Sequence, residues 1–171
     1  MNIDQVPYLN CSDCKVHYGF ETASNSVLDF VLAAVTTLTT QYPGYQLIVT
    51  GHSLGGAVAT LAGLTLLNAG YTPTVYSFGS PRVGNAPFAA YFSKLLVHNY
   101  RVTHYKDLFV HLPPHDFGYT HVNTEIYEDR KGHYKVCTET EDPSCADQWA
   151  LKELNLADHL VYLNRTMMCP V

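Results

Sequence analysis

Residues 47–57 read Leu-Ile-Val-Thr-Gly-His-Ser-Leu-Gly-Gly-Ala, with a serine among three glycines. The β-branched run at 45–50 predicts a short buried strand, and the Ala-, Gly- and Leu-rich segment 54–68 predicts a helix. A serine between such a strand and such a helix must occupy a sharp, strained turn. Gly51 and Gly55 would remove side chains that collide in this turn, so we expect the hydroxyl of Ser53 to stand clear of the sheet.

The turn also predicts a chemical role for Ser53. At the start of a helix the backbone N–H of Leu54 has no helical partner, so it can donate to an oxyanion that develops beside the serine. We therefore expect Ser53 to be a nucleophile and the Leu54 amide to be an oxyanion donor. A second donor is expected from an upstream strand–helix loop, and no evident candidate precedes Ser53. The alternative interpretation is a glycine-rich turn with an incidental serine.

Strand and helix patterns alternate around this turn. Apolar residues at helical spacing predict a helix over 24–42, and Pro43-Gly44 ends it. The other predicted elements are a strand at 74–78, a helix at 87–97, a strand at 100–105, a possible strand at 119–127 and a short apolar stretch at 156–163. This alternation predicts an α/β fold with a mainly parallel central sheet and flanking helices.

A serine nucleophile requires a base and a carboxylate that follow it in the chain. Asp107 follows the predicted strand 100–105, at the carboxyl edge where sites collect in parallel sheets. His159 is flanked by apolar residues that could anchor a loop, so we expect it to be the base. His52 is adjacent to Ser53, and its ring cannot readily fold back onto that hydroxyl. Asp158 is expected to be a solvated or capping residue.

Other titratable residues are expected to be structural. Three further carboxylates lack a preceding strand: Asp116, Asp129 and Asp142. Surface or core positions are expected for His17, His98, His104, His115 and His133.

Composition excludes several classes of protein. The chain has 171 residues, of which 47% are apolar and 15% charged, with a net charge of -5. Length predicts one domain, and the composition excludes an intrinsically disordered chain. No apolar run approaches a membrane span, so we expect a soluble chain and no integral membrane segment. The ten basic residues are not clustered, which argues against a nucleic-acid partner. The N-terminus lacks the pattern of a signal peptide.

Five cysteines occupy positions 11, 14, 137, 145 and 169. Their spacing favours two short disulfides, Cys11–Cys14 and Cys137–Cys145, over a zinc site or a redox motif. Cys169 is then left without a partner, which indicates either a free thiol or a missing stretch of chain.

The succession of motifs resembles the secreted fungal class 3 lipases and the related feruloyl esterases. The resemblance runs through Cys11-x-x-Cys14-Lys-Val-His17-x-Gly19-Phe20, Val49-Thr-Gly-His-Ser-Leu-Gly-Gly-Ala57, Phe78-Gly-Ser-Pro-Arg-Val-Gly-Asn85, Asp107, His111-Leu-Pro-Pro114, Phe117-Gly-Tyr-x-His121, Val136-Cys137, Cys145 and Asp158-His159-Leu160. It implies an α/β-hydrolase fold and a triad of Ser53, Asp107 and His159, without a metal or cofactor. Cys137–Cys145 is also a pairing of that family.

The resemblance implies further roles for individual residues. It suggests that Phe109, Leu112 and Leu160 line a groove for an acyl chain, although these three could equally be core residues. His121 and Glu125 fall on a strand that borders the site, where we interpret them as structural. Cys169 resembles half of a bridge whose partner lies near the N-terminus of the family.

The resemblance also implies a function and a limit. It predicts a secreted triacylglycerol lipase that acts through an acyl-enzyme on lipid or ester substrates, at an oil–water interface, and as a monomer. The alternatives are a feruloyl-type esterase, or a non-catalytic remnant that binds lipid or protein. The match enters partway through the family pattern, so we expect residues 1–171 to be a single hydrolase domain that lacks its N-terminal third. An exposed sheet edge is expected as a result.

Overall fold

The computed structural model describes residues 3–8 and 11–168. Within them the central sheet has the order β3-β4-β5-β6-β7, in which β3 to β6 are parallel and β7 is antiparallel. The strands are β3 (Ile48–His52), β4 (Thr74–Phe78), β5 (Asn99–His104), β6 (Glu125–Glu128) and β7 (Tyr134–Cys137). The mainly parallel sheet confirms the predicted α/β class.

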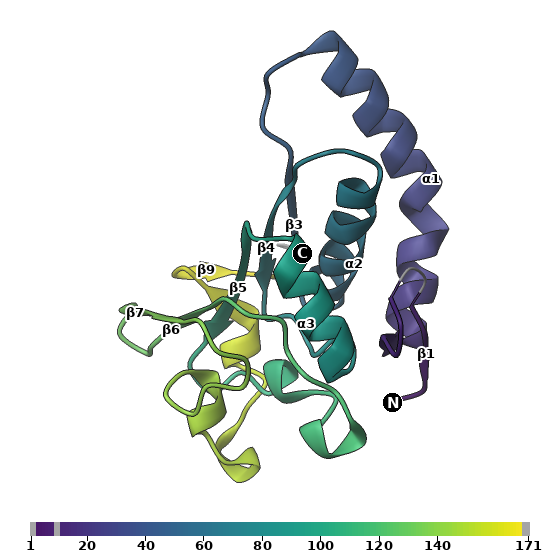
Figure 1. Ribbon diagram of the computed structural model, residues 1–171. Helices are drawn as coiled ribbons and strands as arrows, with labels where there is room; N and C mark the ends of the chain where they lie inside the picture. The colour runs from purple at the N-terminus through teal and green to yellow at the C-terminus, as the bar shows by residue number, and fades with distance from the viewer. Residues whose placement is uncertain (1–2, 9–10, 169–171) are drawn as a thin grey trace.

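Three α-helices in the described residues accompany this sheet: α1 (Tyr18–Gln41), α2 (Leu54–Asn68) and α3 (Ala86–Leu95). The α2 helix contacts β3 and β4, and α1 packs on the side of α2 away from the sheet (Figure 1). Right-handed crossovers between successive parallel strands place α2 and α3 on the same face. Because α2 lies between the sheet and α1, its sequence is apolar on nearly all sides.

The predicted ranges of α2 and β4 agree with the structure, but α1 begins earlier than the apolar pattern predicts. The ring Nδ1 of His17 accepts hydrogen bonds from the N–H groups of Gly19 and Phe20, at 3.0 and 3.3 Å. His17 therefore acts as the N-cap, and the helix starts at Tyr18 instead of Ser24. Histidine is not among the residues usually favoured at this position, so the sequence did not reveal it.

The predicted strand at 119–127 is wrong in its first half, because β6 begins only at Glu125. The N–H of Thr120 donates to the carbonyl of Gly84 at 2.8 Å, and the N–H of His121 donates to the Glu141 carboxylate at 2.8 Å. These groups find partners outside the sheet, so the segment cannot join the ladder.

Short elements complete the described structure. Two antiparallel pairs are β1 (Gln5–Pro7) with β2 (Lys15–His17) and β8 (Val161–Tyr162) with β9 (Arg165–Thr166). The 3-10 helices are η1 (Phe109–His111), η2 (His115–Phe117), η3 (Ala146–Gln148), η4 (Leu151–Glu153) and η5 (Asp158–Leu160). The apolar stretch predicted at 156–163 forms η5 and β8.

The two predicted disulfides, Cys11–Cys14 and Cys137–Cys145, are both formed. The first lies at the edge of the main core, between α2, α3 and the β1–β2 pair, and the second lies in a smaller core beneath η1. Cys169 lies outside the described residues.

One edge of the sheet and one face of α1 are apolar and exposed. Strand β3 is the edge strand of the described sheet, and Ile48 on it is 55% exposed. On α1 the side chain of Phe30 is 81% exposed. No described helix is long and apolar enough to cross a membrane.

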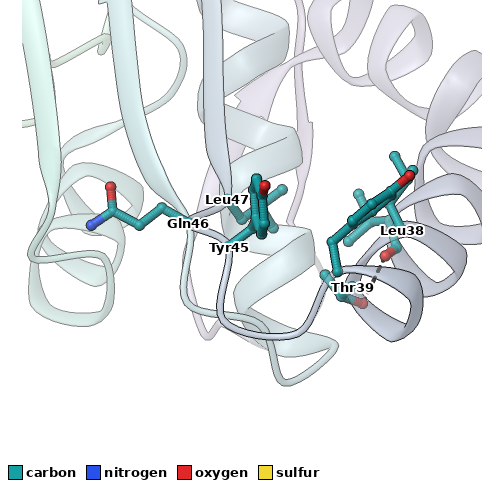
Figure 2. A pocket seen from close by; sticks show the side chains of 7 residues that line it. Leu38, Thr39, Tyr45, Gln46 and Leu47 are labelled. Carbon is teal, nitrogen blue, oxygen red and sulfur yellow. Dashed lines mark hydrogen bonds between the residues drawn. The ribbon is translucent and has the colours of Figure 1, made fainter.

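A mostly apolar pocket of about 440 Å³ lies between the end of α1 and the segment leading into β3. In Figure 2, Tyr45 and Leu47 point into the space beside Leu38, whereas Gln46 points to the opposite side. This pocket lies at the beginning of β3, and the predicted nucleophile lies at the end of that strand.

Candidate active site

Ser53 occupies the strained turn that the sequence predicts. Its backbone dihedrals are φ 57° and ψ -126°, in the positive-φ region that residues other than glycine rarely adopt. The turn is held by a hydrogen bond of 2.9 Å from the N–H of Ser53 to the carbonyl of Phe78 on β4. The side chain is thereby lifted from the end of β3 at the first turn of α2.

The need for glycine in this turn differs from the prediction. A Cβ on Gly51 would overlap the carbonyl of Gly55, so Gly51 is required, as expected. A Cβ on Gly55 would meet nothing within 4 Å, so the expectation of a collision at Gly55 is wrong. Gly56 is the second crowded position, where a Cβ would lie 3.0 Å from that of Ser80. The reason is that Gly55 is crowded through its backbone carbonyl, which faces Gly51, while a Cβ on Gly55 would face open space.

The structure brings Ser53, His159 and Asp107 together from three separate parts of the chain. Nε2 of His159 lies 2.9 Å from Oγ of Ser53. Nδ1 of His159 lies 2.8 and 3.0 Å from the two carboxylate oxygens of Asp107. Asp107 follows β5 and is fully buried, and His159 is on η5 and 4% exposed. Since Nδ1–H must donate to the carboxylate, Nε2 is free to accept the serine proton.

Asp107 receives two further hydrogen bonds. The hydroxyl of Tyr162 donates to Oδ2 at 2.5 Å, and the backbone N–H of Phe109 donates to Oδ1 at 2.7 Å. Burial, together with the negative charge of Asp107, raises the pKa of Tyr162 well above its usual value. The phenol therefore stays protonated and remains a donor. Nothing in the sequence indicates this role for Tyr162 except its position three residues after His159.

Gly79 allows these groups to converge. Its φ is +57°, and a Cβ there would lie 2.9 to 3.1 Å from Tyr162, Asp107 and His159. Any side chain at this position would therefore displace the carboxylate or the imidazole.

The three residues assigned to an acyl groove have different surroundings. The ring of Phe109 stacks on that of His159, with centroids 4.1 Å apart and planes at 23°. Leu112 is half-buried directly after η1, and its carbonyl accepts from the N–H of Arg82 at 2.8 Å. Leu160 is half-buried at the end of η5. Phe109 thus contacts the imidazole directly, and a groove role for the three stays a prediction.

Leu54 is the first residue of α2, so its N–H lies at the unpaired end of the helix next to Ser53.

Asp158 forms a small capping motif with Asn155. The side-chain amide of Asn155 donates to the carboxylate of Asp158 at 2.7 Å, and the backbone N–H of Asp158 donates to Oδ1 of Asn155 at 2.9 Å. It therefore shapes the turn that carries His159.

A buried ion cluster lies beneath η1. Arg82 makes two hydrogen bonds to the carboxylate of Glu141, and Arg101 bonds that of Glu125 at 2.9 Å. Although burial opposes it, the Arg82 hydrogen bonds hold the pKa of Glu141 well below its usual value. Burial and then the charge of Arg101 lower the pKa of His121. His121 and Glu125 thus lie in this buried cluster of charged side chains, which agrees with the interpretation of both as structural residues.

No cluster of three or more His, Cys, Asp or Glu side chains suited to a metal occurs in residues 3–8 and 11–168. A serine hydroxyl, an imidazole and a buried carboxylate in this order can move a proton and form an acyl intermediate.

A serine on a strand–turn–helix elbow of a mainly parallel sheet, with histidine and aspartate supplied by later loops, defines an α/β-hydrolase. The family model for class 3 lipases matches residues 1–117, and the chain belongs to that family.

Similar proteins have names that agree with this family. "Secreted mono- and diacylglycerol lipase 1" of Fusarium solani is 45% identical over 116 residues, covering 68% of this chain and 35% of that protein. "Lipase" of Rhizomucor miehei is 34% identical over 172 residues, covering 96% of this chain and 47% of that protein. The crystal structure of the lipase from Rhizopus microsporus var. chinensis has a TM-score of 0.90 and 34% identity, covering 97% of this chain and 60% of that chain. The chain thus spans between a third and a half of these curated relatives.

Proposed function

We propose that this chain is a serine carboxylester hydrolase of the triacylglycerol lipase type. The observation that carries the proposal is the position of His159, whose two ring nitrogens lie within 3.0 Å of Ser53 and of Asp107. Chain order and the carboxyl edge of the sheet predict the same three residues. A related triacylglycerol lipase structure, 32% identical with a TM-score of 0.90, is described as having a serine protease triad at its catalytic centre.

In the proposed mechanism, Oγ of Ser53 attacks the carbonyl carbon of the ester while its proton passes to Nε2 of His159. The N–H of Leu54 donates to the oxygen that becomes negative. When the tetrahedral intermediate collapses, the alcohol leaves with the proton held by His159, and an acyl-enzyme remains. Water then attacks the acyl carbon, gives a proton to His159, and the acid departs as Ser53 regains its hydrogen. Asp107 stays ionised throughout and orients the imidazole.

The substrate class is proposed from the relatives. Proteins named as mono- and diacylglycerol lipases or as triacylglycerol lipases support acylglycerols over soluble aromatic esters. A further related structure is described as a model for interfacial activation, which supports action at an oil–water interface. Secretion is supported by relatives named as secreted and by the two disulfides, which persist in oxidising compartments.

The test compares the chain with its Ser53→Ala variant on p-nitrophenyl esters of short and long acyl chains. We expect hydrolysis by the parent and a loss of at least about 1000-fold in the variant. A second readout is covalent labelling by diethyl p-nitrophenyl phosphate, followed by peptide mass mapping. Labelling of Ser53 reports an active nucleophile even where turnover is slow. Equal rates for the two folded proteins, with no labelled serine, would contradict the proposal.

A further inference from the structure

Two histidines outside the triad hold the turn that carries His159. Nε2 of His52 lies 2.8 Å from the backbone carbonyl oxygen of His159. Nδ1 of His104 lies 2.9 Å from the backbone carbonyl oxygen of the preceding residue, Asp158. Consecutive carbonyls of η5 are thus each bound by an imidazole from another part of the chain.

The positions of these histidines explain what they connect. His52 is the last residue of β3 and precedes Ser53, whereas His104 is the last residue of β5 and lies three residues before Asp107. The η5 turn that carries His159 is therefore hydrogen-bonded to the end of β3, next to Ser53, and to the end of β5, near Asp107. Each contact spans a large sequence separation, of 107 residues for His52 and 54 for His104.

Ring packing adds to these hydrogen bonds. The ring of Tyr162 packs edge-on against both imidazoles, with its centroid 5.6 Å from that of His52 and 5.7 Å from that of His104. The ring of His52 also lies 4.5 Å from that of His159. Because Tyr162 also donates to Asp107, the packing connects the two histidines with the acid of the triad.

A carbonyl oxygen can only accept a hydrogen bond, and this determines the proton positions. His52 must carry hydrogen on Nε2, and His104 must carry hydrogen on Nδ1. The two histidines are therefore opposite tautomers when neutral. Burial lowers the pKa of His52; the hydrogen bond to the His159 carbonyl opposes this shift, and repulsion from a charged His159 adds to it. This favours a neutral His52 beside the imidazolium that forms during the reaction.

We propose that His52 and His104 are positioning residues, which set the distance from His159 to Ser53 by clamping η5 between β3 and β5. The inference rests on the proposed function for its kinetic consequence, but the clamp itself is a structural claim. A displacement of about 1 Å in a reacting group can cost on the order of 100-fold in rate, so loss of the clamp should lower kcat.

The first experiment needs no activity. Long-range ¹H–¹⁵N correlation spectra of the intact chain at neutral pH would identify the tautomer of each ring, with substitution variants used for assignment. We expect the Nε2–H form for His52 and the Nδ1–H form for His104. The opposite tautomer at either position would overturn the proposal, whether or not the chain hydrolyses esters.

The second experiment uses the geometry of amide side chains. Glutamine places its N–H₂ near the Nε2 position of histidine, and asparagine places it near the Nδ1 position. We expect His52→Gln and His104→Asn to stay within about threefold of the parent kcat. The exchanged variants His52→Asn and His104→Gln, and the phenylalanine variants at both positions, should lose about 10- to 100-fold in kcat, with KM changed little.

The control is His98→Gln, which changes an exposed histidine before β5 and should leave kcat unchanged. The amide variants keep the test informative if the phenylalanine variants fail to fold. Equal losses for the matched and the exchanged amides would overturn the clamp. If the parent shows no hydrolysis and no labelling of Ser53 while both tautomers are as expected, the proposed function fails and the clamp stands.

Discussion

The hydroxyl of Tyr162 and Nδ1 of His159 converge on the same carboxylate oxygen, Oδ2 of Asp107, at 2.5 and 2.8 Å. A buried carboxylate with no exposure requires such donors, because water cannot supply them. The phenol thus stabilises the ionised acid and fixes the orientation in which it receives His159.

Substitution Tyr162→Phe removes this donor and keeps the ring. A hydrogen bond to a charged group contributes about 1.5–3 kcal/mol, so we expect kcat for ester hydrolysis to fall by about tenfold or more while KM stays similar. Steady-state kinetics would measure this, with Tyr134→Phe on the exposed side of β7 as the control. An unchanged kcat would show that Asp107 does not depend on the phenol.

Alanine substitutions at Gly51 and Gly55, on either side of Ser53, should have different effects on stability. Gly51→Ala places a methyl group against the carbonyl of Gly55, and we expect a loss of about 3 kcal/mol in the free energy of unfolding, or no folded protein. Gly55→Ala meets open space and should be neutral, or stabilising by up to about 1 kcal/mol. Urea denaturation of both variants tests the contrast. Similar losses in the free energy of unfolding at the two positions would contradict the packing of the turn described above.

Acid should destabilise the fold through buried histidine. Burial, and then the charge of Arg82, lowers the pKa of His111 to about 4 from the usual 6.5. The unfolded chain then binds a proton at His111 more readily than the folded chain does. The free energy of unfolding therefore falls as the pH drops from the usual pKa of 6.5 toward the lowered pKa of about 4. We expect His111 to account for about 2 kcal/mol of the loss between pH 7 and pH 5.

The measurement is urea denaturation at several pH values for the parent and for His111→Gln. The variant cannot titrate, so its stability should depend less on pH. His121 and His52, whose pKa values are lowered too, retain their share of the slope in both proteins. Parallel curves would exclude His111 as a source of acid sensitivity.

The two ion pairs of Glu141 and Glu153 should differ in strength. Glu141 pairs with Arg82 at 2.6 Å, where the arginine is 4% exposed, whereas Glu153 and Lys106 are 37% and 21% exposed. Glu141→Gln removes the counter-charge that lies 2.6 Å from the buried guanidinium of Arg82 and leaves Asp147 at 3.8 Å, so it should cost about 3–5 kcal/mol. Glu153→Gln should cost less than about 1 kcal/mol. Thermal or urea unfolding would compare them, and equal losses would contradict the assignment of a buried cluster.

Local patterns were sufficient for much of this fold. The strand–turn–helix around Ser53, the range of α2 and the alternation of β4, α3 and β5 follow from hydrophobic periodicity and glycine positions within a few residues. The strand predicted as buried at 45–50 is the exception, because β3 spans Ile48–His52 and is an exposed edge strand. The residues Asp107 and His159 were also predicted, because chain order and the carboxyl edge of a parallel sheet restrict the choices.

Features that depend on distant partners could not be predicted from local sequence. The N-cap at His17 is local, but its residue type is unusual, whereas the start of β6 depends on Gly84 and Glu141. Tyr162, His52 and His104 gain their roles from contacts across 54 to 107 residues. No periodicity encodes such pairs, because they arise only when the strand ends and η5 meet. Local sequence patterns therefore specify the class of fold and the three side chains proposed as the triad, whereas the contacts that hold these side chains within hydrogen-bonding distance form only when distant segments meet.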